Sequence, residues 1–172
     1  MNFYFKQIPE TPKVITSTTS IARLVDGLGF RYYWATEGLT SKEHLFSPGN
    51  GSMTITELNL HIYDLAFISY KTFGGAPIYK KEKLTTFESA REEILSLFEK
   101  LSQHLKTELT DADLVSCNLY AKKYDQEFPF WYMLNGPIAD ALTHVGQITS
   151  WRRLADNPQI KGVNVFLGNQ KT

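Results

Sequence analysis

The sequence contains one cysteine, no long apolar run and no excess of charge of either sign. Cys117 alone cannot form an internal disulfide. No stretch approaches the roughly 18 consecutive apolar residues that a membrane-spanning helix needs. Lysine and arginine total 18, and so do aspartate and glutamate, so no basic field is available to attract a phosphate backbone. These absences predict that neither a nucleic acid nor a membrane is a partner.

Motifs for nucleotide chemistry are also missing. The sequence has no phosphate-binding loop, no glycine-rich dinucleotide fingerprint and no paired cysteines at zinc-binding spacing. Its first residues lack the basic start and apolar run of a secretory signal, which makes the cytoplasm the expected location. With 172 residues, of which 42% are hydrophobic and 21% charged, the composition is that of an ordinary globular protein. We expect one domain over residues 1–172.

Apolar residues recur at helical spacing in four segments, which predict helices at about 18–39, 54–73, 86–106 and 130–156. The second helix should begin after a Thr54-x-x-Glu57 pattern, which can satisfy two amides at a helix start, and should end near 74–77. Between 109 and 128 the helical period is lost, so a non-helical connection is expected. Four helices without a convincing sheet predict an all-α helix bundle.

The start of the fourth helix has two interpretations. Pro137 follows Asn135-Gly136 and is suited to the first turn of a helix, where its missing N–H costs nothing. It is equally suited to a kink inside a helix that begins nearer Pro129. The sequence leaves both open.

A carboxylate and an imidazole lie four residues apart in this helix, at Asp140 and His144. Positions i and i+4 project in nearly the same direction, so the two side chains share one face. The second predicted helix carries His61 on its own apolar face. Two histidines and one carboxylate can bind a divalent first-row metal and leave positions open for water or substrate. If the two helices pack together, the three residues predict a metal centre of the catalytic type.

Each of these residues also has an interpretation without a metal. A histidine such as His61 on an apolar face is often a hydrogen-bonded, partly buried residue. An acid such as Asp140 in a first helical turn is favoured by the helix dipole alone. Asp64, one turn after His61, is either a solvated acid or an acceptor that orients the imidazole. Arg152, in a last turn, either complements the dipole or recognises an anion.

Two blocks of the sequence resemble a known family. They are Glu57-Leu58-x-x-His61-Ile-x-Asp64, which follows a Pro48-Gly49 turn, and His144-x-Gly146-Gln147-Ile-x-x-x-Arg152-Arg153. Their order and spacing resemble the DinB/YfiT-like superfamily of metalloenzymes, over most of the chain from the first helix through Phe166. The resemblance implies an up-down-down-up four-helix bundle. In it a divalent metal is held by one histidine of the second helix and by a His-x-x-x-His pair of the fourth.

Asp140 stands where the resemblance places the first histidine of that pair. A carboxylate keeps ligand chemistry but makes the site harder and adds one negative charge, which changes metal preference. The metal implied is nickel or zinc, with iron or manganese as the other choices; alternatively, the site has decayed and binds nothing. The residues expected at the metal are His61, Asp140 and His144, and those expected around it or in a substrate pocket are Asp64, Gln147 and Arg152.

Characterised members of the superfamily catalyse metal-dependent thiol chemistry, in which the metal lowers the pKa of a bound thiol or water. The resemblance therefore implies a thiol-dependent transferase or a hydrolase with a small-molecule substrate, such as a low-molecular-weight thiol, and a homodimer. The other hypothesis is a metal-free or non-catalytic bundle that serves as a small-ligand or protein-interaction module.

Overall fold

Four long helices dominate the computed structural model, which describes residues 4–73, 81–121 and 125–171. They are α1 (Ser17–Thr36), α3 (Ile55–Thr72), α4 (Phe87–Thr107) and α7 (Ala139–Leu154). The short elements are η1 (Tyr4–Lys6), α2 (Ser41–His44), α5 (Asp111–Leu114), β1 (Asn118–Ala121), β2 (Gln126–Pro129), α6 (Trp131–Met133), η2 (Leu134–Ile138), β3 (Val163–Asn164) and β4 (Asn169–Gln170). No helix among these described residues is long and apolar enough to cross a membrane.

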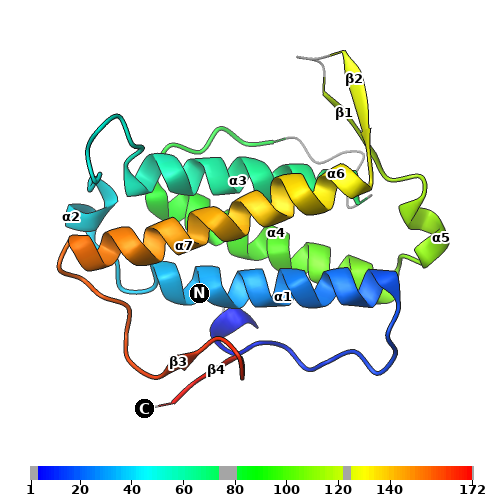
Figure 1. Cartoon of the computed structure of the whole chain (residues 1–172), viewed down its shortest axis with the longest axis horizontal. Coiled ribbons are helices and arrows are strands. Elements are labelled where there is room, and N and C mark those ends of the chain that lie inside the picture. Colours follow the sequence, from blue (N-terminus) through cyan, green and yellow to red (C-terminus); the bar gives the residue numbers. More distant parts are fainter. Residues whose placement is uncertain (1–3, 74–80, 122–124, 172) are drawn as a thin grey trace.

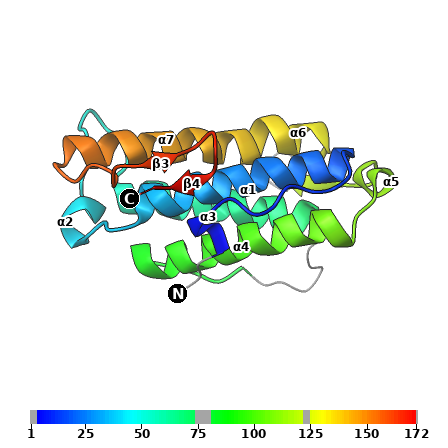
Figure 2. The same ribbon diagram turned by 90° about the horizontal axis from the view of Figure 1, so that it is seen from below.

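The four long helices form the predicted bundle. In Figure 1, α1 and α7 run in one direction and α3 and α4 run in the other, which is the up-down-down-up topology. Both α4 and α7 pack against α1 and against α3, so α7 lies beside the helix that carries His61. Figure 2 shows the C-terminal hairpin β3–β4 lying over α1 and α7. The expected fold class is confirmed.

Local signals in the sequence explain where three of the long helices begin. The side chains of Thr16, Thr54 and Thr86 each accept a hydrogen bond from the backbone amide three residues later, at the starts of α1, α3 and α4. The Thr54–Glu57 capping box is present as predicted, with the Glu57 carboxylate 2.7 Å from the Thr54 amide. The predicted end of this helix near 74–77 lies outside the described residues.

Two buried polar links tie the bundle together between the apolar layers. Asp26 of α1 is fully buried and accepts hydrogen bonds from Ser102 at 2.5 Å and from Lys106 at 2.7 Å, both on α4. Asn59 of α3 accepts a bond from the Tyr32 hydroxyl at 2.6 Å and donates to the Phe87 carbonyl at 3.1 Å. Because buried polar groups are costly when unpaired, these links select one arrangement of α1, α3 and α4.

The fourth predicted helix is interrupted. It begins at α6 and continues through η2, a π-helical turn, into α7, so Pro137 marks a kink and not a helix start. Gly136 has non-helical angles, with φ −89° and ψ −107°, and Pro137 has no N–H to continue the hydrogen-bond ladder. Such π turns are frequent beside functional sites. Asp140 follows the interruption directly, in the first turn of α7.

The expected non-helical connection over 109–128 is only partly right. It contains α5 and an antiparallel hairpin in which Leu119 of β1 pairs with Phe128 of β2. Both side chains pack against the main core, although neither four-residue strand has enough apolar alternation to be recognised in the sequence. The structure therefore adds a small hairpin, and a second one at the C-terminus, to a helical bundle.

Candidate metal centre

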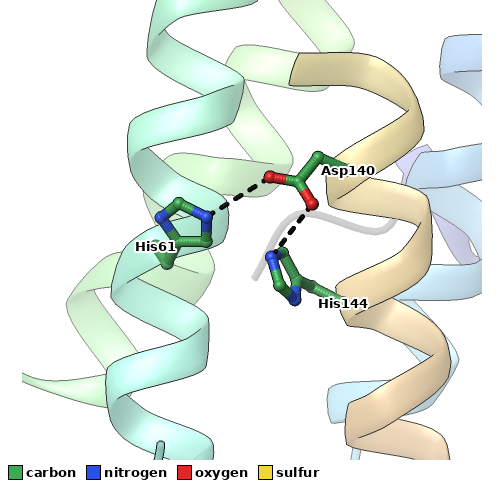
Figure 3. Close-up of side chains that lie close together, drawn as sticks. All are labelled: His61, Asp140 and His144. Atoms are coloured by element: carbon green, nitrogen blue, oxygen red, sulfur yellow. Dashed lines mark ion pairs between the residues drawn. The ribbon is translucent and has the colours of Figure 1, made fainter. Parts of the chain in front are cut away.

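His61, Asp140 and His144 come together on one side of the bundle. His61 projects from α3, and the other two side chains project from the first turns of α7 toward it (Figure 3). The Asp140 carboxylate lies between the imidazoles: Oδ2 is 3.4 Å from Nε2 of His61 and Oδ1 is 3.2 Å from Nε2 of His144. The two rings have centroids 4.8 Å apart and meet edge to face at 75°. The three residues predicted as ligands are therefore adjacent.

The spacing of the three side chains fits a shared metal ion. One ligand atom from each residue lies within 4.8 Å of the others. In a tetrahedral site with metal–ligand bonds of 2.0–2.1 Å, neighbouring ligand atoms are about 3.3–3.4 Å apart. The nitrogen–oxygen separations of 3.2 and 3.4 Å are of that size, with one made by each oxygen of the Asp140 carboxylate. Two imidazoles and a carboxylate are also the donor types that divalent first-row metals accept, so the residues fit such an ion.

Gln147 fixes the orientation of one imidazole. Its Oε1 lies 2.7 Å from Nδ1 of His144, one turn along α7. With the proton of a neutral ring on Nδ1, the lone pair is on Nε2, which faces the Asp140 oxygen. Two acceptor atoms at 3.2 Å repel each other unless a proton or a cation lies between them. Metal-binding histidines commonly donate their second N–H to an oxygen in this way.

The cluster is open to solvent on one side. The side chain of His144 is 16% exposed, that of His61 36% and that of Asp140 44%. The neighbouring residues Ala141 and Val145 of α7 are buried and anchor this helix in the core. A bound ion would thus have three protein ligands and an accessible side, which is the arrangement of catalytic sites rather than of closed structural ones.

Asp64 faces a groove beside His61 and does not contact its imidazole within the described contacts. Its carboxylate forms an ion pair with Lys81, a residue that is not among the expected site residues. The groove has a volume of about 390 Å³, and its wall includes His61, Tyr63, Lys83 and Leu84. The lysine-rich sequence around Lys81 carries no local signal for a contact with α3, because Lys81 and Asp64 are 17 residues apart and meet only through the tertiary fold.

Arg152 lies away from the metal centre, and most of its hydrogen bonds are to backbone carbonyls of the protein. It is 2% exposed, and its Nη1 donates to the carbonyls of Trp34, Ala35 and Glu37 at 3.0–3.1 Å, while Nε donates to the Asn157 carbonyl at 2.7 Å. The guanidinium thereby satisfies carbonyls at the end of α1 that have no partner within the helix. The expectation that Arg152 lines the substrate pocket is wrong, because these carbonyls occupy its donors.

His44 lies beside the polar residues Lys42 and Glu43, a setting typical of a solvent-exposed residue. It is instead 9% exposed and stacks on the Phe87 ring, with centroids 4.0 Å apart. Desolvation lowers its pKa, although the nearby carboxylates of Glu88 and Glu43 oppose the shift. The residue belongs to the packing at the α2 end of the bundle and lies outside the metal centre.

The fold and the cluster together define a four-helix bundle with a candidate divalent-metal centre on its surface. No family model matches the sequence, and no curated protein matches it either. Among solved structures the chain is similar to YfiT from Bacillus subtilis, described as a probable metal-dependent hydrolase with an unusual four-helix bundle topology. The identity is 13% and the TM-score 0.63, over 89% of this chain and 98% of that one. The comparison confirms the fold.

Replacement of Gln147 tests the orientation of the His144 ring. We expect Gln147→Leu to weaken zinc binding by about 10- to 100-fold, because the Nδ1 acceptor is lost. Competition with a chromophoric zinc chelator measures the affinity. Ser150→Ala, an exposed change on the same helix, is the control and should bind as the unmodified protein does. An affinity within twofold of normal for Gln147→Leu would contradict this role.

Replacement of Arg152 tests its structural assignment. Arg152→Met should lower the free energy of unfolding by about 3 kcal/mol, because several buried carbonyls lose their donor. Denaturant titration measures the change. The matched control is Arg153→Met at the exposed neighbouring position, with an expected change within about 0.5 kcal/mol. A loss below about 1 kcal/mol for Arg152→Met would show that these contacts do not stabilise the bundle.

Proposed function

We propose that the protein is a divalent-metal-dependent enzyme that hydrolyses a small molecule, with His61, Asp140 and His144 as the metal ligands. The observation that carries the proposal is that the Asp140 carboxylate lies 3.4 Å from the His61 imidazole of the other helix and 3.2 Å from the His144 imidazole, in a cluster open to solvent on one side. The shared fold adds support, since YfiT is described as a probable metal-dependent hydrolase.

The donor set favours particular metals. Imidazole suits zinc, nickel and iron, and a carboxylate shifts the preference toward harder ions such as manganese. Zinc and nickel remain the first choices because two of the three ligands are imidazoles. The Asp140 charge partly neutralises a divalent ion, whereas three neutral histidines would leave the full charge. His61, Asp140 and His144 would hold the ion, and the chemistry that it would supply is a lower pKa for a bound water or thiol and polarisation of the group under attack.

The protein side chains supply orientation and a binding surface. Gln147 holds the His144 ring with Nε2 toward the carboxylate, at an Nδ1–Oε1 distance of 2.7 Å. The groove of about 390 Å³ next to His61 is of the size that small-molecule sites have. Tyr63 and Leu84 give it apolar wall. Its charged residues are of both signs: Glu57, Asp64, Glu82, Lys81 and Lys83. We propose that the substrate binds there, with its reacting group toward His61.

The nucleophile distinguishes hydrolysis from the thiol transfer that the sequence resemblance implies. Water serves in the first reaction and a low-molecular-weight thiol in the second. Both reactions need the same three metal ligands, so metal binding does not distinguish them. A metal-binding measurement instead separates both enzymes from the metal-free interaction module.

Metal stoichiometry tests the proposal directly. After removal of bound metal and incubation with zinc or nickel, the protein should hold about one ion per chain, and His144→Ala should hold less than about one-tenth. His104→Ala, a change on α4 where the ring pairs with Glu108, is the matched control and should retain the ion. Elemental analysis of untagged protein provides the measurement.

The loaded protein should then hydrolyse a set of activated esters and amides, with and without added thiol, and lose this activity with chelator. A preparation that binds less than about one-tenth ion per chain with zinc, nickel, manganese and iron would overturn the proposal and favour the metal-free module. Turnover that requires the thiol would identify a transferase in place of a hydrolase.

A further inference from the structure

A second groove lies on the opposite face of α7 from the metal centre. It has a volume of about 430 Å³ and is bounded by α1, α7 and the segment around β3, which crosses both helices in Figure 2. At 100° per residue, Leu142, Gly146 and Thr149 project roughly opposite to Asp140 and His144. The groove is therefore separate from the proposed catalytic site, although the same helix forms both.

Two arginines give the groove an unbalanced positive charge. Arg31 of α1 and Arg153 of α7 both line it, and no aspartate or glutamate is among the described residues of its wall. Neither arginine forms an ion pair with a described carboxylate; Arg31 donates only to the Gly27 carbonyl of its own helix, at 3.2 Å. In a chain with a formal net charge of zero, two arginines without acidic partners in one hollow favour an anion.

Apart from Thr149 and Gln159, which add polar groups, the rest of the wall is apolar. Leu142 and Val145 of α7 face Val163 and Val165 of the C-terminal segment across the groove. Leu142 and Val165 are 41% and 48% exposed, so apolar surface remains uncovered beside the arginines. Gly146 also lines the groove and leaves open space, since a Cβ at this position would have no atom within 4 Å. A ligand that matches this wall needs a short hydrocarbon part.

We propose that this groove binds a small aliphatic anion, with its carboxylate or phosphate between Arg31 and Arg153 and its hydrocarbon chain along Leu142, Val145 and Val163. The volume of about 430 Å³ lies within the range of small-molecule sites. A guanidinium group can bind either a carboxylate or a phosphate through two parallel N–H donors. Binding here does not require the metal centre.

Calorimetric titration with sodium octanoate tests the site. We expect one saturable site per chain with a dissociation constant of about 1 mM or tighter. Acetate has the charge without the chain, and 1-octanol has the chain without the charge, so each should bind at least tenfold more weakly. Octyl phosphate should bind to the same site and compete with octanoate.

Three variants locate the bound anion. Arg31→Gln and Arg153→Gln should each weaken octanoate binding about tenfold or more, because a hydrogen bond to a charged group is lost. Arg23→Gln, a change on α1 where the guanidinium donates to the Pro9 carbonyl, is the matched control and should bind normally. Gly146→Leu should abolish binding by filling the groove. It should not lower the melting temperature, because leucine is a better helix former than glycine.

His144→Ala should bind octanoate as the unmodified protein does, which separates this site from coordination of the carboxylate by a metal. The inference is overturned if octanoate shows no saturable binding up to about 5 mM. It is also overturned if the arginine variants and Gly146→Leu bind normally, or if His144→Ala loses the binding. A dimer that covers the groove and excludes octanoate would likewise overturn it.

Discussion

The packing of α7 against α3 is the constraint on which the candidate site depends. His61 lies on one helix and Asp140 and His144 on the other, so the 3.4 Å contact between His61 and Asp140 exists only in this register, whereas the 3.2 Å contact between Asp140 and His144 lies within α7. A rotation of α7 by one residue would turn both of its ligands by about 100°, away from α3. The rotation is set by Ala141, Val145 and Ile148, which are buried in the core. The interruption at η2 then allows the preceding segment to leave the helical path without moving these residues.

Electrostatics within the cluster explain why a cation is the natural complement of this arrangement. A carboxylate between two imidazoles offers acceptor atoms toward a common centre, and the Gln147 contact at 2.7 Å favours the His144 tautomer with its lone pair on Nε2. The acceptors repel one another until a positive charge lies between them. With Asp140 beside two imidazoles, the cluster therefore presents one carboxylate charge to a cation.

Local signals in the sequence were sufficient for the four long helices and for the shared face of Asp140 and His144. The Thr54–Glu57 capping box fixes a helix start, and the spacing of Asp140 and His144 places both on one face, because helix geometry alone determines both results. The contacts made by Arg152 and Lys81, and the β1–β2 hairpin, join residues far apart in the sequence and have no local signature. The sequence also could not decide whether Pro137 begins a helix or kinks one, since both conformations are compatible with the local residues.

X-ray absorption spectroscopy of the zinc-loaded protein reports the ligands of the ion itself. If His61, Asp140 and His144 bind the ion, the spectrum should show nitrogen and oxygen ligands at about 2.0–2.1 Å with outer-shell scattering from two imidazoles, and from only one in His61→Ala. A spectrum without imidazole scattering, or one that His61→Ala leaves unchanged, would rule out this metal centre.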